Sequence, residues 1–214
     1  MNNPKFQSRP AMLRGWLTAS SAALLLGLSM GAAHANEIAT TICAACHGAD
    51  GDTPIAPNYP RIAGLQKEYI VKQLNDFLSG KRKSDVMLPM AQQIPPDQIE
   101  TVAEYFSQQK RSHGKAESRV VASAGKVMYN AGNEESGVPA CVGCHQPKGA
   151  GFLSSTGIYP RLSGQQAEYV KEQLKAFATG ERSNDQSRFM RTTAKRMTDE
   201  EIDEVAQYLM GVDD

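Results

Sequence analysis

Residues 43–47 read CAACH and residues 141–145 read CVGCH, so one five-residue pattern occurs twice in this chain of 214 residues. On a helical turn, positions i, i+3 and i+4 share one face. Two cysteines with this spacing reach the two vinyl groups of one haem, and the following histidine lies under the iron. C-x-x-C-H is the attachment signature of c-type haem. The pentads therefore predict two covalently bound haem c groups, held by Cys43, Cys46, His47, Cys141, Cys144 and His145.

Three other uses of these cysteines fit the pattern less well. A thioredoxin-like redox pair belongs to a fold with strands, which the sequence does not indicate. Zinc ribbons use cysteine pairs about 15 to 20 residues apart, whereas 98 residues separate Cys43 from Cys141. A disulfide within one C-x-x-C closes too short a loop to remove much chain entropy. Haem attachment in both copies is therefore the favoured interpretation.

A long internal repeat follows each pentad. Residues 59–85 and 159–185 align at a constant offset of 100, and 13 of the 27 pairs are identical. The pentads match at an offset of 98, and Ile99 matches Ile202 at an offset of 103, so short loops absorb the differences. A repeat of this length predicts two copies of one domain rather than a solenoid.

The predicted boundaries follow from this repeat and from a polar stretch between its copies. Residues 107–119 read SQQKRSHGKAESR and lack an apolar period, which indicates a helix end followed by a linker. We expect the first domain over residues 36–110, the linker over 111–119 and the second domain over 120–214. Residues 1–35 form a separate leader.

The leader has the composition of a cleavable signal peptide. Lys5, Arg9 and Arg14 give it a basic start, and an apolar stretch from Trp16 to Met30 precedes the small-residue tripeptide AHA. Such a leader directs export, so we expect the mature chain in the periplasm. The remaining sequence has no second apolar run of about 20 residues and no basic run. It therefore predicts no membrane span and no nucleic-acid binding, while peripheral membrane association through a partner stays open.

Apolar residues recur at helical spacing in both copies. Positions i, i+4 and i+7 are apolar in Ile70, Leu74 and Phe77 and again in Val170, Leu174 and Phe177. A closing helix around Ile99, and another around Ile202, carries a further apolar stripe. No alternating strand pattern of useful length is found, so the predicted fold class is all-α. Each domain has few apolar residues and needs a large group such as a haem at its centre.

The second axial ligand of each iron is predicted to be methionine. Outside the leader and the pentads the chain has a single histidine, His113, whose polar surroundings indicate a solvated surface residue. Two haems with two histidine ligands each are therefore impossible within one chain. A thioether ligand favours ferrous iron and raises the reduction potential.

The repeat selects among the methionines. Counting back from the closing helices, Met87 aligns with Met190, whereas Met90 aligns with Thr193. Met197 takes the place of an isoleucine in the first copy, which indicates a core residue. Met87 and Met190 are therefore the predicted ligands, on the assumption that no gap separates ligand and closing helix.

The chain resembles the di-haem cytochrome c4 family over essentially the whole mature sequence. Besides the pentads, the resemblance rests on the stretches YPRIAGLQ, YPRLSGQQ, GNEESGVPACVGCH and SNDQSRFMRTTAKRMTDEEI. It implies a tandem pair of class I cytochrome c domains, each wrapped around one covalent haem with His and Met ligands. It also implies that the carbonyls of Pro60 and Pro160 support the ligating histidines. Arg61 and Arg161 are candidates to pair with haem propionates.

Two features depart from the family pattern. Only residues 36–42 precede the first pentad in the mature chain, whereas residues 118–133 give the second pentad a fuller helix. The amino-terminal helix of the first domain is therefore expected to be short or absent, which leaves the haem of that domain more exposed. Met90 is the second departure, because it places a rival thioether three residues from Met87.

The predicted coordination indicates electron transfer rather than catalysis. A haem with His and Met ligands has no open position, which suits outer-sphere transfer and disfavours chemistry on oxygen or peroxide. We expect a carrier, not an enzyme, that passes one electron per haem from a quinol-oxidising cytochrome complex toward a terminal oxidase or another electron carrier. The alternatives are the di-haem subunit of a flavocytochrome c sulfide dehydrogenase, which resembles the same family, and a di-haem peroxidase, which the in-register methionines disfavour.

Overall fold

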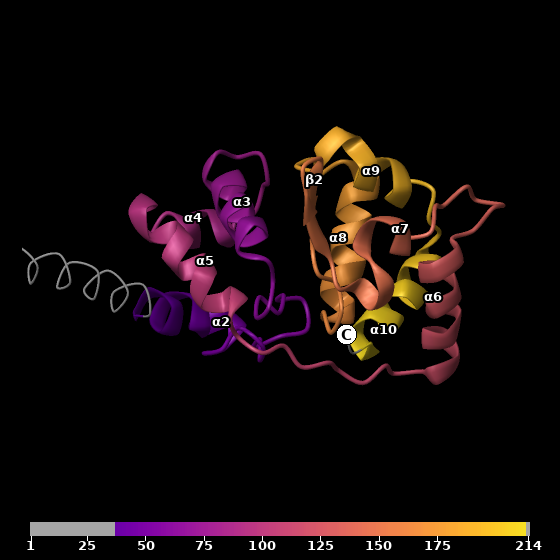
Figure 1. Ribbon diagram of the computed structural model, residues 1–214, viewed down its shortest axis with the longest axis horizontal. Coiled ribbons are helices and arrows are strands. Elements are labelled where there is room, and N and C mark those ends of the chain that lie inside the picture. Colours follow the sequence, from indigo (N-terminus) through magenta and orange to yellow (C-terminus); the bar gives the residue numbers. More distant parts are fainter. Residues whose placement is uncertain (1–36, 213–214) are drawn as a thin grey trace, which may run out of the picture.

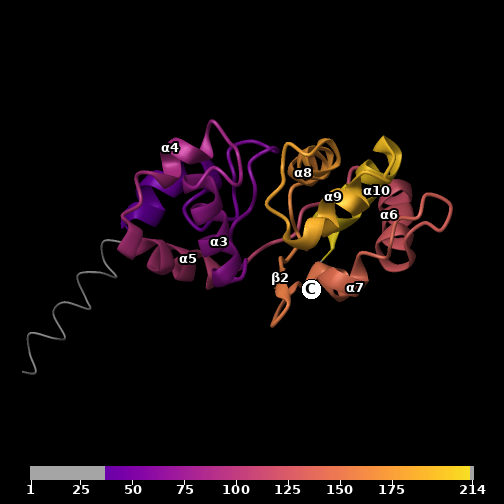
Figure 2. The same cartoon turned by 90° about the horizontal axis from the view of Figure 1, so that it is seen from above.

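The computed structural model describes residues 37–212, and the predicted leader lies outside the described residues. The helices before residue 108 gather in one domain and those after residue 118 in another (Figure 1). The view from above shows the same division (Figure 2). Helices make up nearly all of the regular structure in the described part, which confirms the all-α class.

The first domain arranges its helices around the first pentad. Its elements are the π-helical turn η1 (Ala39–Cys43), α2 (Ala44–His47), α3 (Lys67–Leu78), α4 (Met87–Ala91), the 3-10 turn η2 (Pro96–Gln98) and α5 (Ile99–Ser107). The described chain enters the pentad directly from η1. It therefore has before Cys43 only a short helical turn, where the second domain has a full helix.

The second domain repeats this plan with additions. Its elements are α6 (Arg119–Ala131), α7 (Val142–His145), η3 (Pro147–Gly149), β1 (Phe152–Ser154), β2 (Gly157–Tyr159), α8 (Ala167–Thr179), η4 (Gln186–Arg188), α9 (Phe189–Ala194) and α10 (Asp199–Gly211). In the repeat, α8 corresponds to α3, α9 to α4 and α10 to α5. The helix α10 begins with the capping box typical of Ser/Thr-x-x-Glu starts, formed by Thr198 and Glu201.

A two-stranded hairpin in the second domain departs from the purely helical expectation. Strand β1 pairs antiparallel with β2, and Phe152 stands opposite Tyr159. Their rings stack with centroids 4.7 Å apart. Strands of three residues are too short to produce an alternating pattern, so the sequence gives no signal for them. With the hairpin, the loop from pentad histidine to supporting proline spans 15 residues, against 13 in the first domain.

Each domain has its own cluster of buried apolar side chains. The first cluster includes Ile38, Ile70, Leu74, Phe77, Ile94, Ile99, Val102 and Phe106. The second includes Met128, Tyr129, Val138, Val170, Val205 and Leu209. The predicted apolar stripes of the four main helices therefore face the two cores. Met197 packs against the second cluster, in agreement with its alignment to the core residue Ile94.

Helices α6 and α10 cross at very close range. A Cβ atom added to Gly125 in α6 would lie 1.8 Å from the backbone oxygen of Glu204 in α10. No side chain fits at this distance, so the crossing depends on glycine. It holds the core face of α10 against the helix that leads to the second pentad.

Replacing Gly125 with alanine is expected to lower the free energy of unfolding by about 3 kcal/mol, because the added methyl forces the two helices apart. Thermal unfolding of the purified protein measures the loss. Gly143→Ala is the matched control, because Gly143 is also helical and nothing lies within 4 Å of its added Cβ. The control is expected to change stability by less than about 0.5 kcal/mol. Equal losses in both variants would contradict the close-crossing argument.

Candidate functional site

One continuous cavity of about 1220 Å³ extends through both domains. Both pentads contribute to its wall, with the residues Cys43, Cys46, His47, Cys141, Cys144 and His145. Apolar side chains of α3 and α8, among them Leu74, Phe77, Val170 and Phe177, complete much of the lining. Protein interiors normally leave few voids larger than a water molecule. A cavity of this size at the centre of two small domains therefore fits large, mostly apolar groups.

The two pentad histidines are buried and held by the same contact. Nδ1 of His47 lies 2.8 Å from the backbone oxygen of Pro60, and Nδ1 of His145 lies 3.1 Å from that of Pro160. A carbonyl oxygen only accepts, so Nδ1 carries the proton and Nε2 keeps a free lone pair. Burial lowers the pKa of both imidazoles, and the carbonyl contact opposes this only in part. Each ring is thus neutral and oriented to bind a metal through Nε2.

The four pentad cysteines form no disulfides with one another. Burial raises the pKa of the Cys43 and Cys141 thiols to about 11 each. Such thiols stay protonated at neutral pH, unlike the low-pKa thiols of thioredoxin-like motifs. Among residues 37–212, no three His, Cys, Asp or Glu side chains gather where they would hold one metal ion. The two cysteine pairs are therefore not combined in a zinc site.

Both predicted methionine ligands line the same cavity. Met87 comes from α4 and Met190 from α9, the counterpart of α4 in the second domain. Met90 also lines the cavity, while the amide of Gln93 lies 3.7 Å from its sulfur. The structure thus brings every predicted site residue to the cavity wall. Each domain also offers a second thioether on the wall, Met90 in the first and Met197 in the second.

These residues fit two c-type haem groups. In each domain two thiols and an imidazole occupy one helical turn, which is the arrangement needed to attach and ligate a single haem. The fixed Nδ1–carbonyl contact leaves the other ring nitrogen for iron, and an apolar wall surrounds the space beside it. A thioether on a separate helix is available as the sixth ligand in both domains.

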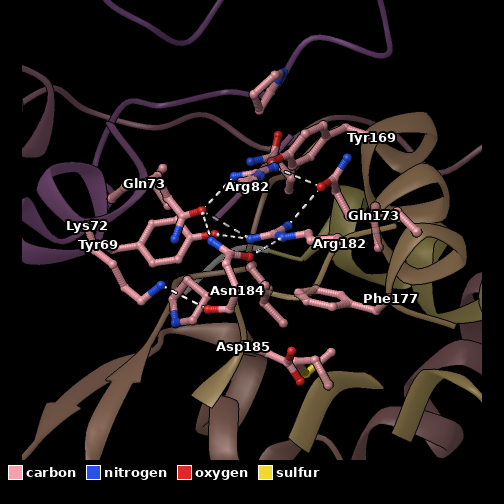
Figure 3. Close-up of a pocket in the computed structure, with 18 of the residues that line it drawn as sticks. Tyr69, Lys72, Gln73, Arg82, Tyr169, Gln173, Phe177, Arg182, Asn184 and Asp185 are labelled. Carbon is pink, nitrogen blue, oxygen red and sulfur yellow. Dashed lines mark hydrogen bonds between the residues drawn. The ribbon is translucent and has the colours of Figure 1, made fainter. Parts of the chain in front are cut away.

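A polar cluster joins the two domains at the cavity wall (Figure 3). This interface cluster consists of Tyr69, Gln73, Arg82, Tyr169, Gln173, Arg182 and Asn184. Arg82 donates to the hydroxyl of Tyr169 at 2.9 Å and to Oε1 of Gln173 at 2.7 Å. Arg182 makes the reciprocal contacts, to the hydroxyl of Tyr69 at 3.1 Å and to Oε1 of Gln73 at 3.4 Å. The repeated residues thus make a two-fold set of reciprocal contacts across the domain interface.

Both arginines of the interface cluster are buried, and each stacks on an aromatic ring. Arg82 stacks 4.7 Å from the ring centroid of Phe77, and Arg182 stacks 4.4 Å from that of Phe177. Burial alone would raise the pKa of Tyr69, but the two guanidinium groups outweigh it and lower that pKa. Two buried positive charges thus stand beside the cavity, where they would favour anionic groups.

Arg61 and Arg161 take part in contacts near the domain interface. Arg61 donates through Nη1 to the backbone oxygen of Gly164 in the other domain, at 2.5 Å. Arg161 donates through Nε to Oγ of Ser163 at 2.8 Å. Their predicted pairing with haem propionates stays a prediction. The interface cluster was not predicted from the sequence, although its Tyr, Gln and Arg form identical polar pairs at the offset of 100.

Comparison with known proteins supports the assignment of two haem sites. The sequence model of the cytochrome c family matches residues 32–110 and 122–213. Cytochrome c4 of Thiocapsa roseopersicina is 42% identical over 174 residues, which cover 81% of this chain and 88% of the relative. A thiosulfate dehydrogenase electron acceptor of Thiomonas intermedia is 40% identical over 169 residues, covering 78% of this chain and 76% of the relative.

A solved structure extends the similarity to the fold. The crystal structure of reduced recombinant cytochrome c4 from Pseudomonas stutzeri superposes with a TM-score of 0.76 at 33% identity, covering 86% of this chain and 98% of that one. Within the described residues, no helix is long and apolar enough to cross a membrane. With two cytochrome c domains and two covalent haem c groups for transferring electrons between redox proteins, this chain belongs to the di-haem cytochrome c4 family.

Proposed function

We propose that the chain is a periplasmic carrier of one electron per haem, with His47 and Met87 ligating the first iron and His145 and Met190 the second. The observation that carries the ligand assignment is the paired setting of the histidines, each buried, neutral and held through Nδ1 by a proline carbonyl. Haem c supplies an iron that changes between its ferrous and ferric states. The proposed domains span residues 36–110 and 120–214, and residues 111–119 link them.

The residues around each proposed site suit electron transfer without substrate binding. The proline carbonyls fix both imidazole rings, so little reorganisation accompanies a change of charge at the metal. Buried apolar side chains such as Phe77, Ile94 and Val102 line the cavity and exclude water. A thioether at the sixth position leaves no place for oxygen or peroxide. The arrangement therefore supports a carrier rather than a peroxidase.

Replacing Met87 with alanine is expected to remove about half of the weak long-wavelength absorption that sulfur ligation gives ferric haem, because one of the two irons loses its thioether. Replacing Met90 with alanine is expected to leave the band unchanged. The absorption spectrum of the fully oxidised protein measures both results. Met190→Ala should remove the other half and thereby calibrates the size of the effect.

The opposite pattern would overturn the ligand assignment in the first domain. If Met90→Ala loses the band and Met87→Ala keeps it, Met90 is the ligand. If each single variant keeps the band and only the double variant loses it, the two thioethers replace each other. Met197→Ala removes the second thioether on the cavity wall of the second domain and is expected to keep the band, which makes it the counterpart of Met90→Ala.

For the direction of flow, we propose a quinol-oxidising cytochrome complex as donor and a terminal oxidase as acceptor. The name of the Thiomonas relative favours thiosulfate dehydrogenase as a second donor. The two donors are distinguished by mixing the oxidised protein with each purified enzyme and its own substrate, quinol or thiosulfate, and following haem reduction. Reduction by neither donor would contradict both assignments. Stable co-purification with a flavoprotein would instead favour the enzyme-subunit alternative.

A further inference from the structure

The second domain carries two insertions that the first domain lacks, and they meet beside the proposed ligand Met190. Asp85 and Asp185 align at the offset of 100, whereas Met87 and Met190 align at 103, so the second copy has three extra residues here. These residues form η4 (Gln186–Arg188). The other insertion is in the loop that carries the hairpin of β1 and β2, which is two residues longer than its counterpart, and the side-chain amide of Gln186 donates to the backbone oxygen of Thr156 at the hairpin turn.

The inserted segment is strained and held in place. Ser187 and Arg188 have φ values of 50° and 61°, in the left-handed region that side chains rarely adopt. Directly around it, Asp185 accepts from the backbone N–H of Arg191 at 3.0 Å and from its Nε at 2.6 Å. Strain of this kind persists only where surrounding contacts fix it, and it is common at functional sites. These contacts fix the segment at the start of α9, where residues 186–188 are exposed.

The surface formed there is basic with an apolar centre. Phe189 is 60% exposed, an unusual setting for a ring that also lines the cavity next to Met190. Arg188, directly before α9, and Lys195 and Arg196, directly after it, are also exposed. Among the described residues, no carboxylate lies within ion-pair distance of these three cations, although Arg196 donates to the backbone oxygen of Gly137.

The first domain lacks these basic residues at the aligned positions. At the aligned positions on and beside α4, Val86 stands for Phe189, Gln92 for Lys195 and Gln93 for Arg196, while Arg188 belongs to the three extra residues and has no counterpart. The second domain therefore presents three positive charges near its proposed methionine ligand, whereas the first presents a valine and two amides at the aligned positions. A partner that recognises charge would distinguish the two domains.

We propose that the α9 face, made of Gln186–Arg188, Phe189, Lys195 and Arg196, docks a redox protein whose own docking surface is acidic. The inference rests on the proposed electron-carrier function and assigns exchange with that partner to the second haem. An apolar centre with a charged rim is the composition of transient protein interfaces, and opposite charge speeds the encounter. A lipid surface is the weaker fit, because lipid-binding patches use clusters of about 4 to 8 basic residues.

Paramagnetic broadening by hexacyanochromate(III), a trianion that exchanges no electrons here, tests the charge preference in the reduced, haem-loaded protein. A haem-bound methionine gives an upfield methyl signal in NMR, which is assigned to each domain from Met87→Ala and Met190→Ala. At low ionic strength the anion is expected to broaden the Met190 signal at concentrations that leave the Met87 signal sharp. The double variant R188Q/K195Q should need roughly three- to tenfold more anion for the same broadening.

The matched control K81Q/K126Q removes two charges from exposed lysines outside the α9 face and is expected to behave as wild type. Equal broadening of both signals, or no change in R188Q/K195Q, would overturn the proposal. Binding to phosphatidylglycerol vesicles that R188Q/K195Q abolishes, without selective broadening, would also overturn it and indicate a membrane site. Failure of the carrier function itself is seen separately, because the upfield methyl signals would then be missing before any anion is added.

Discussion

Replacing both Cys141 and Cys144 with alanine is expected to halve the haem content per chain and to unfold the second domain. A haem c group attached to these cysteines would fill the part of the cavity that they line. Leaving half of the 1220 Å³ cavity unfilled costs on the order of 10 kcal/mol at about 24 cal/mol per Å³. A typical domain has a total stability of about 5 to 15 kcal/mol, so the second domain is not expected to fold without its haem.

Haem absorbance per mole of protein and limited proteolysis measure this result together. Cleavage is expected within residues 119–211, while the first domain keeps its haem and its resistance. The mirror variant, Cys43→Ala with Cys46→Ala, is the matched control and should reverse the pattern. Retention of both haems, or equal protease resistance of the two domains in the cysteine-free variant, would show that the cavity does not depend on covalent attachment.

The local chemistry of the sites could be predicted because each motif is short and self-contained. In C-x-x-C-H the spacing alone sets which side chains share a helical face, so Cys43, Cys46 and His47 had to lie together. Met87 and Met190 needed the repeat as well, since a single copy gives no reason to prefer Met87 over Met90. The structure places both Met87 and Met90 on the cavity wall, which shows why the sequence alone left a rival.

Contacts between the domains could not be predicted in this way. Arg82 and Tyr169 are identical to their repeat counterparts, but identity does not reveal that each contacts the other domain rather than its own. That depends on the relative orientation of two domains whose linker has no regular pattern. The hairpin of β1 and β2 could not be predicted for a different reason. Strands of three residues give no periodic signal, and the pairing of Phe152 with Tyr159 becomes visible only in the fold.

Replacing Arg82 and Arg182 with methionine together is expected to separate the domains. Each guanidinium is buried, with 8% and 9% exposure, and each donates across the interface. Losing Arg82 removes the donor to the hydroxyl of Tyr169, and losing Arg182 removes the donor to that of Tyr69, each at a cost of about 2 kcal/mol. Small-angle scattering should show a larger radius for the double variant, and proteases should cut residues 107–119 faster. Lys81→Met is the control, because it removes a neighbouring exposed charge and is expected to change neither measurement.

The double variant is expected to lose more stability than the two single variants combined. Oε1 of Gln173 accepts from Arg82 at 2.7 Å and from Arg182 at 2.8 Å, so it keeps one donor in each single variant and none in the double. The two cations also repel each other, and removing either one already relieves that repulsion, so the second removal brings no further relief. Both effects have the same sign, and chemical denaturation of the four proteins measures their sum as a coupling energy. Strict additivity would mean that the arginines act independently and that another contact holds the domains together.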